Sequence, residues 1–147
     1  MLEVPETTDV LVLDTNIALD LFVFQDPATA LLRECVERMD GRWIATTAMR
    51  EELARVLGYP QIASRLAAPS RSAQGVLDAF DRCARLVPQA PKAAHTCKDP
   101  DDQKFIDLAA AHRATLVSKD DAVLCMAKRL ARVGVHVCRQ WSSHHVV

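Results

Sequence analysis

Carboxylate side chains stand at four separate places in the sequence where they could act together chemically. Asp14 and Asp120 each follow directly on a short apolar run, which is the pattern of a buried strand. Glu52 lies within a helical pattern, and an Asp-Pro-Asp-Asp run occupies residues 99–102. Because the ends of parallel strands meet at one edge of a sheet, we expect these acids to converge on one crevice.

Such a cluster cannot remain fully charged and unpartnered. Two like charges about 4 Å apart repel by about 4 kcal/mol at an effective dielectric constant near 20. The acids must therefore take up protons, move apart or bind a cation. Ligation by oxygen alone suits Mg²⁺ or Mn²⁺. A bound ion of this kind activates water and stabilises charge on a phosphodiester, so the pattern predicts metal-dependent phosphodiester hydrolysis.

Each acid also has a simpler explanation in helix capping. Asp99 fits an N-cap, Pro100 fits the first helical position, and Asp102 stands three residues after the cap, as in a capping box. Asp14 or Thr15 could equally cap the helix that follows the first strand. The sequence leaves both explanations open.

Helical periodicity separates one pair of neighbouring acids but not the other. Glu51 falls opposite the apolar stripe of its helix and is expected in solvent, whereas Glu52 lies on the flank of the stripe, near the core. Asp101 and Asp102 flank the stripe of the next helix at similar angles, so periodicity does not choose between them. The first stripe consists of Met49, Leu53, Val56 and Leu57.

The apolar runs and turn signals alternate along the chain as strands and helices. Strands are predicted at 10–13, 43–46, 86–87, 115–118 and 135–137. Helices are predicted after residue 16, at 27–39, at 48–57 with Thr47 as N-cap, at 61–67, at 70–86, from residue 100 onward and at 122–132. This alternation predicts an α/β fold with a parallel sheet, right-handed crossovers and helices on both faces.

Length and composition fit one ordinary domain. The chain has 147 residues, of which half are hydrophobic and a quarter are charged. We expect a single domain over 1–147, with its core at about 9–138 and a tail at 139–147. The net charge of −1 argues against broad electrostatic coating of nucleic acid, although a local basic path remains compatible with it.

Several classes of protein are disfavoured. No signal peptide is expected, because residues 1–6 are acidic and lack an apolar run, and no apolar run is long enough to span a bilayer, so no membrane association is expected. Five cysteines without C-x-x-C spacing favour reduced thiols in a cytoplasmic protein. His144 and His145 are expected to be a feature of the tail. Glycine-rich phosphate-binding motifs and a serine nucleophile elbow are absent.

Four motifs, in this order and spacing, resemble the PIN domain family over about residues 9–138. They are residues 12–16 (Val-Leu-Asp-Thr-Asn), 52–53 (Glu-Leu), 99–105 (Asp-Pro-Asp-Asp-Gln-Lys-Phe) and 117–120 (Val-Ser-Lys-Asp). The third motif is most similar to the branch described as toxin components of toxin–antitoxin systems.

The resemblance implies a three-layer α/β/α sandwich with a central, mostly parallel sheet. It implies an endoribonuclease that depends on Mg²⁺ or Mn²⁺, acts on RNA and often forms a homodimer, with a small antitoxin protein as a further partner. The rival interpretation is a nucleic-acid-binding PIN module that does not cleave and is regulated by a protein partner.

The resemblance also implies roles for individual residues. It assigns metal binding and catalysis to Asp14, Glu52, Asp102 and Asp120. Glu52 would bind a second ion or orient the attacking water. The expected polar supports are Asn16, Ser118 and Asp101, the last as a charge favoured by the helix dipole.

Basic residues near these motifs are candidates for phosphate contacts. They are Lys104, Lys119, Lys128 and Arg129. The run 118–122, Ser-Lys-Asp-Asp-Ala, departs from the Thr-Gly-Asp-x-Asp that is usual in the family. The departure places Lys119 where it could crowd or partly neutralise the metal site.

Overall fold

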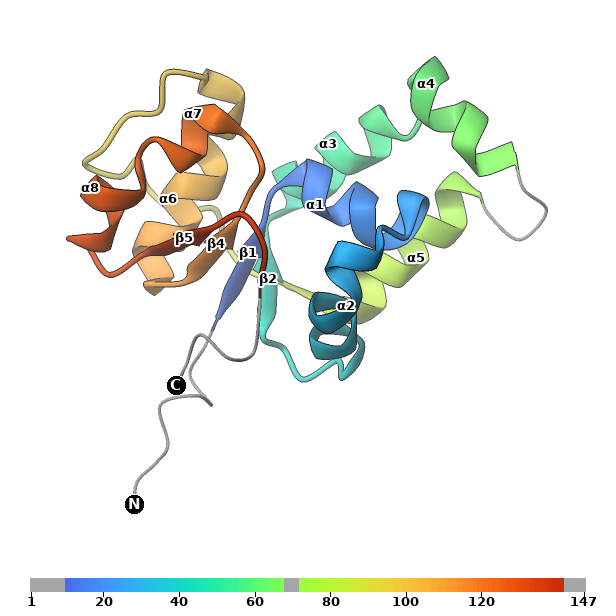
Figure 1. Ribbon diagram of the computed structural model, residues 1–147, viewed down its shortest axis with the longest axis horizontal. Helices are drawn as coiled ribbons and strands as arrows, with labels where there is room; N and C mark the ends of the chain where they lie inside the picture. The colour runs from blue at the N-terminus through green and yellow to red at the C-terminus, as the bar shows by residue number, and fades with distance from the viewer. Residues whose placement is uncertain (1–9, 68–71, 142–147) are drawn as a thin grey trace.

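Five short strands form an all-parallel sheet in the order β3-β2-β1-β4-β5. The computed structural model describes residues 10–67 and 72–141 (Figure 1). The strands are β1 (Leu11–Leu13), β2 (Trp43–Ala45), β3 (Ala84–Leu86), β4 (Thr115–Val117) and β5 (His136–Cys138). The predicted α/β fold with a parallel sheet is confirmed.

Helices fill the connections between the strands. Between β1 and β2 these are α1 (Thr15–Leu19), the π-helical turn η2 (Asp20–Phe24), the 3₁₀ turn η3 (Pro27–Thr29) and α2 (Ala30–Glu37). Between β2 and β3 they are α3 (Thr47–Val56), α4 (Pro60–Ala63), the 3₁₀ turn η4 (Ser64–Ala67) and α5 (Ala73–Cys83). The later connections hold the 3₁₀ turn η5 (Pro100–Asp102), α6 (Gln103–His112), α7 (Asp121–Leu124) and α8 (Ala127–Ala131).

The helices lie in two layers, one on each side of the sheet. Figure 1 shows α6, α7 and α8 on one side, with α1, α2, α3 and α5 on the other. Strand order explains this division, since the chain steps outward from β1 to β3 and then returns to place β4 and β5 on the opposite flank. Right-handed crossovers in opposite directions put their helices on opposite faces. The predicted three-layer α/β/α sandwich is thus confirmed.

The strand order reverses between β1 and β4, and the carboxyl ends of strands at such a switch point are the usual place for a ligand in open α/β sheets. Both strands are buried along their length, as their continuous apolar runs predicted. The ladder pairs Leu13 with Val117, and the Asp14 N–H donates to the Val117 carbonyl at 3.1 Å. This register brings Asp14 beside the residue after Val117, which is Ser118.

An aromatic group fixes α5 and η2 against the sheet. The Trp43 ring stacks on Phe22, with centroids 6.0 Å apart, and meets Phe80 edge to face at 5.1 Å. Such pairs add roughly 0.5–1.5 kcal/mol to the burial of their area. The core therefore continues from the sheet into the helical layer that carries α3.

Three predicted boundaries were wrong. The helix expected to reach residue 86 ends at Cys83, because residues 84–86 pair with β2, and the ladder replaces the helical hydrogen bonds there. The N-cap of α3 is Thr46, whose hydroxyl accepts the Met49 N–H, and not Thr47. The helix expected at 122–132 is divided into α7 and α8, with buried Met126 between them.

Some predictions concern residues outside the described ranges. These are the start of the expected helix at 70–71 and the tail from residue 142 onward, with His144 and His145. In the part that is described, α5 begins after Ser72, whose hydroxyl accepts the Gly75 N–H. No helix in residues 10–67 and 72–141 is long and apolar enough to cross a bilayer.

The interior strand β4 should contribute strongly to stability. Leu116→Ala is expected to lower the free energy of unfolding by about 2–5 kcal/mol, because Leu116 is fully buried and truncation leaves a cavity. Leu31→Ala on α2 removes the same atoms from a side chain that is 43% exposed. It should change the free energy of unfolding by less than about 1 kcal/mol. Urea denaturation measures both, and equal losses would contradict this account of the core.

Candidate metal centre

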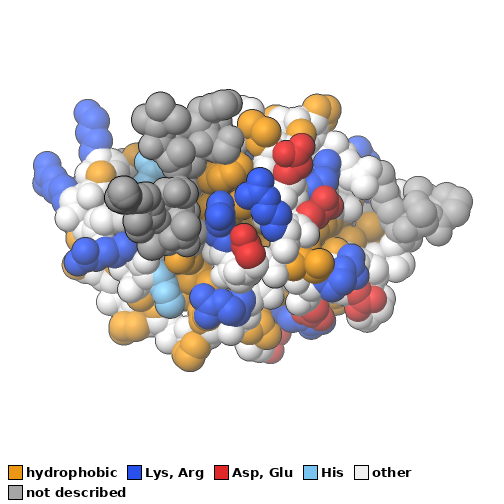
Figure 2. Space-filling model, turned by 90° about the horizontal axis from the view of Figure 1, so that it is seen from below, with side chains coloured by type: hydrophobic (Ala, Val, Ile, Leu, Met, Phe, Trp, Pro, Cys, Tyr) orange, Lys and Arg blue, Asp and Glu red, His pale blue; other side chains and the backbone are white. Residues whose placement is uncertain are grey.

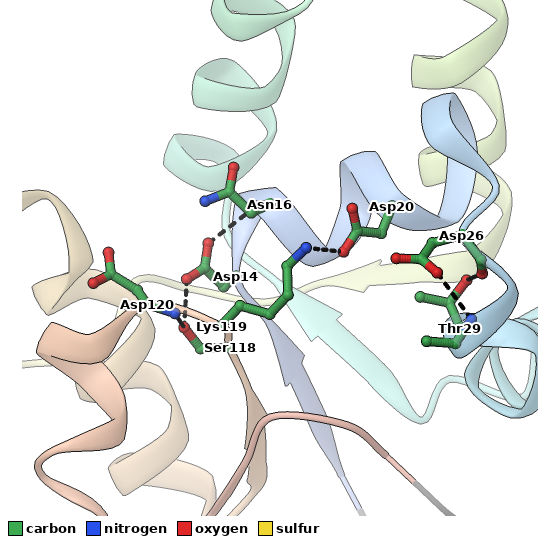
Figure 3. Close-up of polar contacts among 9 residues, drawn as sticks. Asp14, Asn16, Asp20, Asp26, Thr29, Ser118, Lys119 and Asp120 are labelled. Atoms are coloured by element: carbon green, nitrogen blue, oxygen red, sulfur yellow. Dashed lines mark hydrogen bonds and ion pairs between the residues drawn. The ribbon is translucent and has the colours of Figure 1, made fainter.

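The two carboxylate oxygens of Asp14 contact two different segments, the start of α1 and the residue after β4. Oδ1 accepts the Asn16 backbone N–H at 3.0 Å and thereby caps α1. Oδ2 accepts the Ser118 hydroxyl at 2.7 Å (Figure 3). The Asn16 side chain itself is exposed, so its contact with Asp14 is made by the backbone.

Asp120 is held at the end of β4 by the same serine. Its N–H donates to Ser118 Oγ at 3.0 Å, and its Oδ1 caps α7 by accepting the Ala122 N–H at 2.9 Å. Ser118 is 0% exposed, so its hydroxyl links Asp14 and Asp120 without competition from solvent. It donates to one and accepts from the other.

Asp102 reaches Asp14 and Asp120 from the turn η5. Asp99 caps this turn by accepting the Asp101 N–H at 3.0 Å, with Pro100 in the first position, as predicted. The Asp102 side chain makes no capping hydrogen bond to α6. Asp102 is buried, whereas Asp101 is exposed. The structure thus separates the two acids that periodicity could not.

One carboxylate oxygen from each of Asp14, Asp102 and Asp120 lies within 4.8 Å of the others. Two unit charges at that distance repel by about 3.5 kcal/mol at an effective dielectric constant near 20. A folded domain is stable by only about 5–15 kcal/mol. Three ionised and unpartnered carboxylates would therefore consume much of that stability.

Protons relieve this repulsion when no cation is bound. Burial, followed by contact with Asp120 and repulsion from Asp14, raises the pKa of Asp102 to about 8. Burial also raises the pKa of Asp14, while the Ser118 hydroxyl and the Asn16 N–H oppose the rise. Hydrogen bonds from Asp102 and the Ala122 N–H lower the pKa of Asp120. One proton is therefore held between Asp102 and Asp120.

The residues fit a divalent cation better than a proton. Asp102 Oδ2 is buried and has no hydrogen-bond partner among the described residues. The donor set contains carboxylate oxygens without thiol or imidazole, which favours hard ions such as Mg²⁺ and Mn²⁺. A cation at this point would neutralise the repulsion and give the buried oxygen a ligand contact.

Glu52 lies at the margin of this group. Its side chain is 18% exposed and Glu51 is exposed, in line with the helical period. Glu52 Oε1 forms an ion pair of 2.6 Å with Lys104 Nζ. Its charge is near enough to raise the pKa of Asp14, but Glu52 is not among the three residues within 4.8 Å of one another. The structure brings three of the four expected carboxylates into one group.

Lys119 turns toward an acid that the sequence interpretation had not singled out. Its Nζ lies 2.6 Å from Asp20 Oδ2, on the far side of Asp14 from Asp120 in Figure 3. Asp20 is buried in η2, and the signal that could have revealed it is a charge within the apolar stretch 17–24. Both residues line a cavity of about 150 Å³, together with Asp26 and Arg139. Lys119 thus balances the charge of Asp20, and its ammonium points toward Asp20 and away from Asp120 (Figure 3).

The remaining predicted cations lie elsewhere on the surface. Lys128 and Arg129 are exposed on α8. Lys98, which the sequence interpretation had not selected, is close enough to the cluster to lower the pKa of Asp120. Its place directly before the Asp-Pro-Asp-Asp run was the available signal.

A parallel α/β sandwich with three aspartates at its switch point defines a protein with a candidate metal site made of carboxylates. The family model of the PIN domain matches residues 10–122, more than half of the chain. The chain belongs to the PIN domain family, whose members are generally nucleases acting on nucleic acid with a divalent metal. No curated protein sequence matches it significantly.

The shared proton predicts how stability depends on pH. The pKa of Asp102 is about 8 in the folded chain and about 3.9 in an unfolded one, so the folded state binds more protons between these values. In EDTA, the free energy of unfolding should therefore fall as pH rises from about 4 to about 8. Asp102→Asn should weaken this dependence and raise the melting temperature at pH 8 by several degrees, at about 2–4 °C for each kcal/mol.

Differential scanning fluorimetry from pH 4 to 9 measures this dependence. Asp101→Asn is the matched control, since it removes an exposed charge from the same turn and should retain the wild-type slope. A wild-type slope in Asp102→Asn would show that the proton is bound elsewhere.

Proposed function

We propose that this protein is a metal-dependent endoribonuclease. The observation that carries the proposal is the group of three aspartates, drawn from β1, η5 and the end of β4, around a buried oxygen without a hydrogen-bond partner. Membership of the PIN family supports nuclease chemistry, and the resemblance of residues 99–105 to toxin components supports RNA as the substrate.

Each acidic residue has its own role in this proposal. Asp14, Asp102 and Asp120 hold Mg²⁺ or Mn²⁺, which activates water and stabilises the charge that develops on the phosphodiester. Ser118 keeps Asp14 and Asp120 in register through its two hydrogen bonds. Glu52, beside the group, orients the attacking water.

The proposed contacts with RNA are local. On the face shown in Figure 2, Lys and Arg side chains intermingle with Asp and Glu and with hydrophobic side chains, in keeping with the net charge of −1. Arg139, which lines the cavity that Lys119 and Asp20 also line, is proposed to meet phosphates there, whereas the charge of Lys119 is matched by Asp20. Lys128 and Arg129 are proposed to extend this path along α8. Lys104 is not proposed as a phosphate contact, because its charge is matched by that of Glu52.

We further propose that the protein is a cytoplasmic toxin of a toxin–antitoxin pair and acts as a homodimer. Affinity purification from cells that carry its neighbouring genes should recover a small protein that lowers nuclease activity at least tenfold. Light scattering of the protein without this partner should give twice the chain mass. Recovery of an active monomer without any inhibitor would contradict both parts.

Cleavage of RNA is the main test. Wild-type protein should cleave a labelled single-stranded RNA with Mn²⁺ or Mg²⁺ and lose this activity in EDTA. Asp14→Asn and Asp120→Asn should each lower the rate by roughly 100-fold or more, because each removes a charge that holds the ion. Asp121→Asn, an exposed neighbour in α7, is the matched control and should retain activity.

Three results would contradict the mechanism. They are activity that survives EDTA, equal activity of Asp14→Asn and wild type, and preference for DNA of the same sequence. Salt-dependent RNA binding without turnover would favour the rival function, a binding module regulated by a partner.

A further inference from the structure

The Lys104 ammonium is held in place by three neighbours. It lies 2.6 Å from Glu52 Oε1 and donates to the Asp101 carbonyl at 2.6 Å. It also lies 5.0 Å from the centroid of the Phe105 ring. The side chain is 27% exposed, so much of it is shielded from water. These contacts distinguish Lys104 from a freely solvated surface lysine.

The ion pair joins two helices. Glu52 belongs to α3 and Lys104 to the first turn of α6, and these helices lie on opposite sides of the sheet (Figure 1). Lys104 is two residues after Asp102, and the charge of Glu52 acts on Asp14. The pair thus lies near Asp14 and Asp102, where an unpaired Glu52 would offer a ligand for a second ion.

We propose that Lys104 is a built-in cation that takes the place of a second divalent ion and positions Glu52. The centre then binds one divalent ion, through the three aspartates. This inference rests on the proposed function only in requiring that those aspartates bind a metal. Lys104 acts on Glu52 and is a positioning residue; it is not a contact for RNA phosphate.

Charge balance supports one ion over two. One divalent ion on three carboxylates leaves a charge of −1, and the Glu52–Lys104 pair adds none. A second ion at Glu52 would have to displace the ammonium from both its carboxylate and its carbonyl partner. The displaced lysine would then stand close to two divalent cations, and this repulsion disfavours the exchange.

Mn²⁺ titration followed by electron paramagnetic resonance tests the inference without reference to activity. Wild-type protein should bind one ion per chain. Lys104→Met, which retains the length of the side chain without its charge, should bind two, because Glu52 becomes available. Lys104→Arg should restore one. The double variant Lys104→Met/Glu52→Gln should also bind one, since the second site loses its carboxylate.

Lys128→Met is the matched control, because it removes a lysine charge from exposed α8 and should leave one ion bound. Two ions on wild type, or one ion on a folded Lys104→Met, would overturn this inference and leave the proposed function standing. No bound ion on wild type would overturn both. Circular dichroism verifies folding, and if Lys104→Met fails to fold, Lys104→Gln and the wild-type count decide the question.

Discussion

Repulsion among three aspartates at the switch point of the sheet is the constraint around which the rest of the structure is arranged. The parallel ladder between β1 and β4 brings Asp14 beside Ser118, and Asp102 comes from η5, directly before α6. None of these segments is adjacent to another in sequence. A proton or cation must compensate the repulsion among the three carboxylates, so the fold favours the binding of positive charge at this point.

Helix capping and metal binding are compatible uses of the same carboxylate. Asp14 and Asp120 each use one carboxylate oxygen to accept a backbone N–H in the first turn of a short helix. That bond fixes the orientation of each side chain, and one oxygen of each carboxylate still lies within 4.8 Å of the other acids. Asp102 differs because Asp99 caps its turn instead. Its Oδ2 is left without a hydrogen-bond partner among the described residues, and its carboxyl holds the proton that a metal would replace.

Two lysines near the site form ion pairs with carboxylates, which leaves them less available to a substrate. Lys104 and Lys119 each lie 2.6 Å from a carboxylate that is itself largely buried, Glu52 and Asp20 respectively. An unpaired buried carboxylate is costly, so a long and flexible lysine within reach is drawn to it. The basic side chains that remain exposed, on α8 and along the cavity beside Lys119, are those available to a polyanion.

Local sequence determined at which edge of the sheet the site lies, and tertiary structure decided which residues belong to the site. Apolar runs identified the buried strands and hence Asp14 and Asp120 at their ends, while helical period separated Glu52 from Glu51. Those features depend on neighbours a few residues away. The choice of Asp102 over Asp101, the strand at 84–86 and the carboxylate partners of the two lysines depend on which distant elements pack together. Because these contacts join segments remote in sequence, no local pattern encodes them, and only the folded chain places three aspartates around one point.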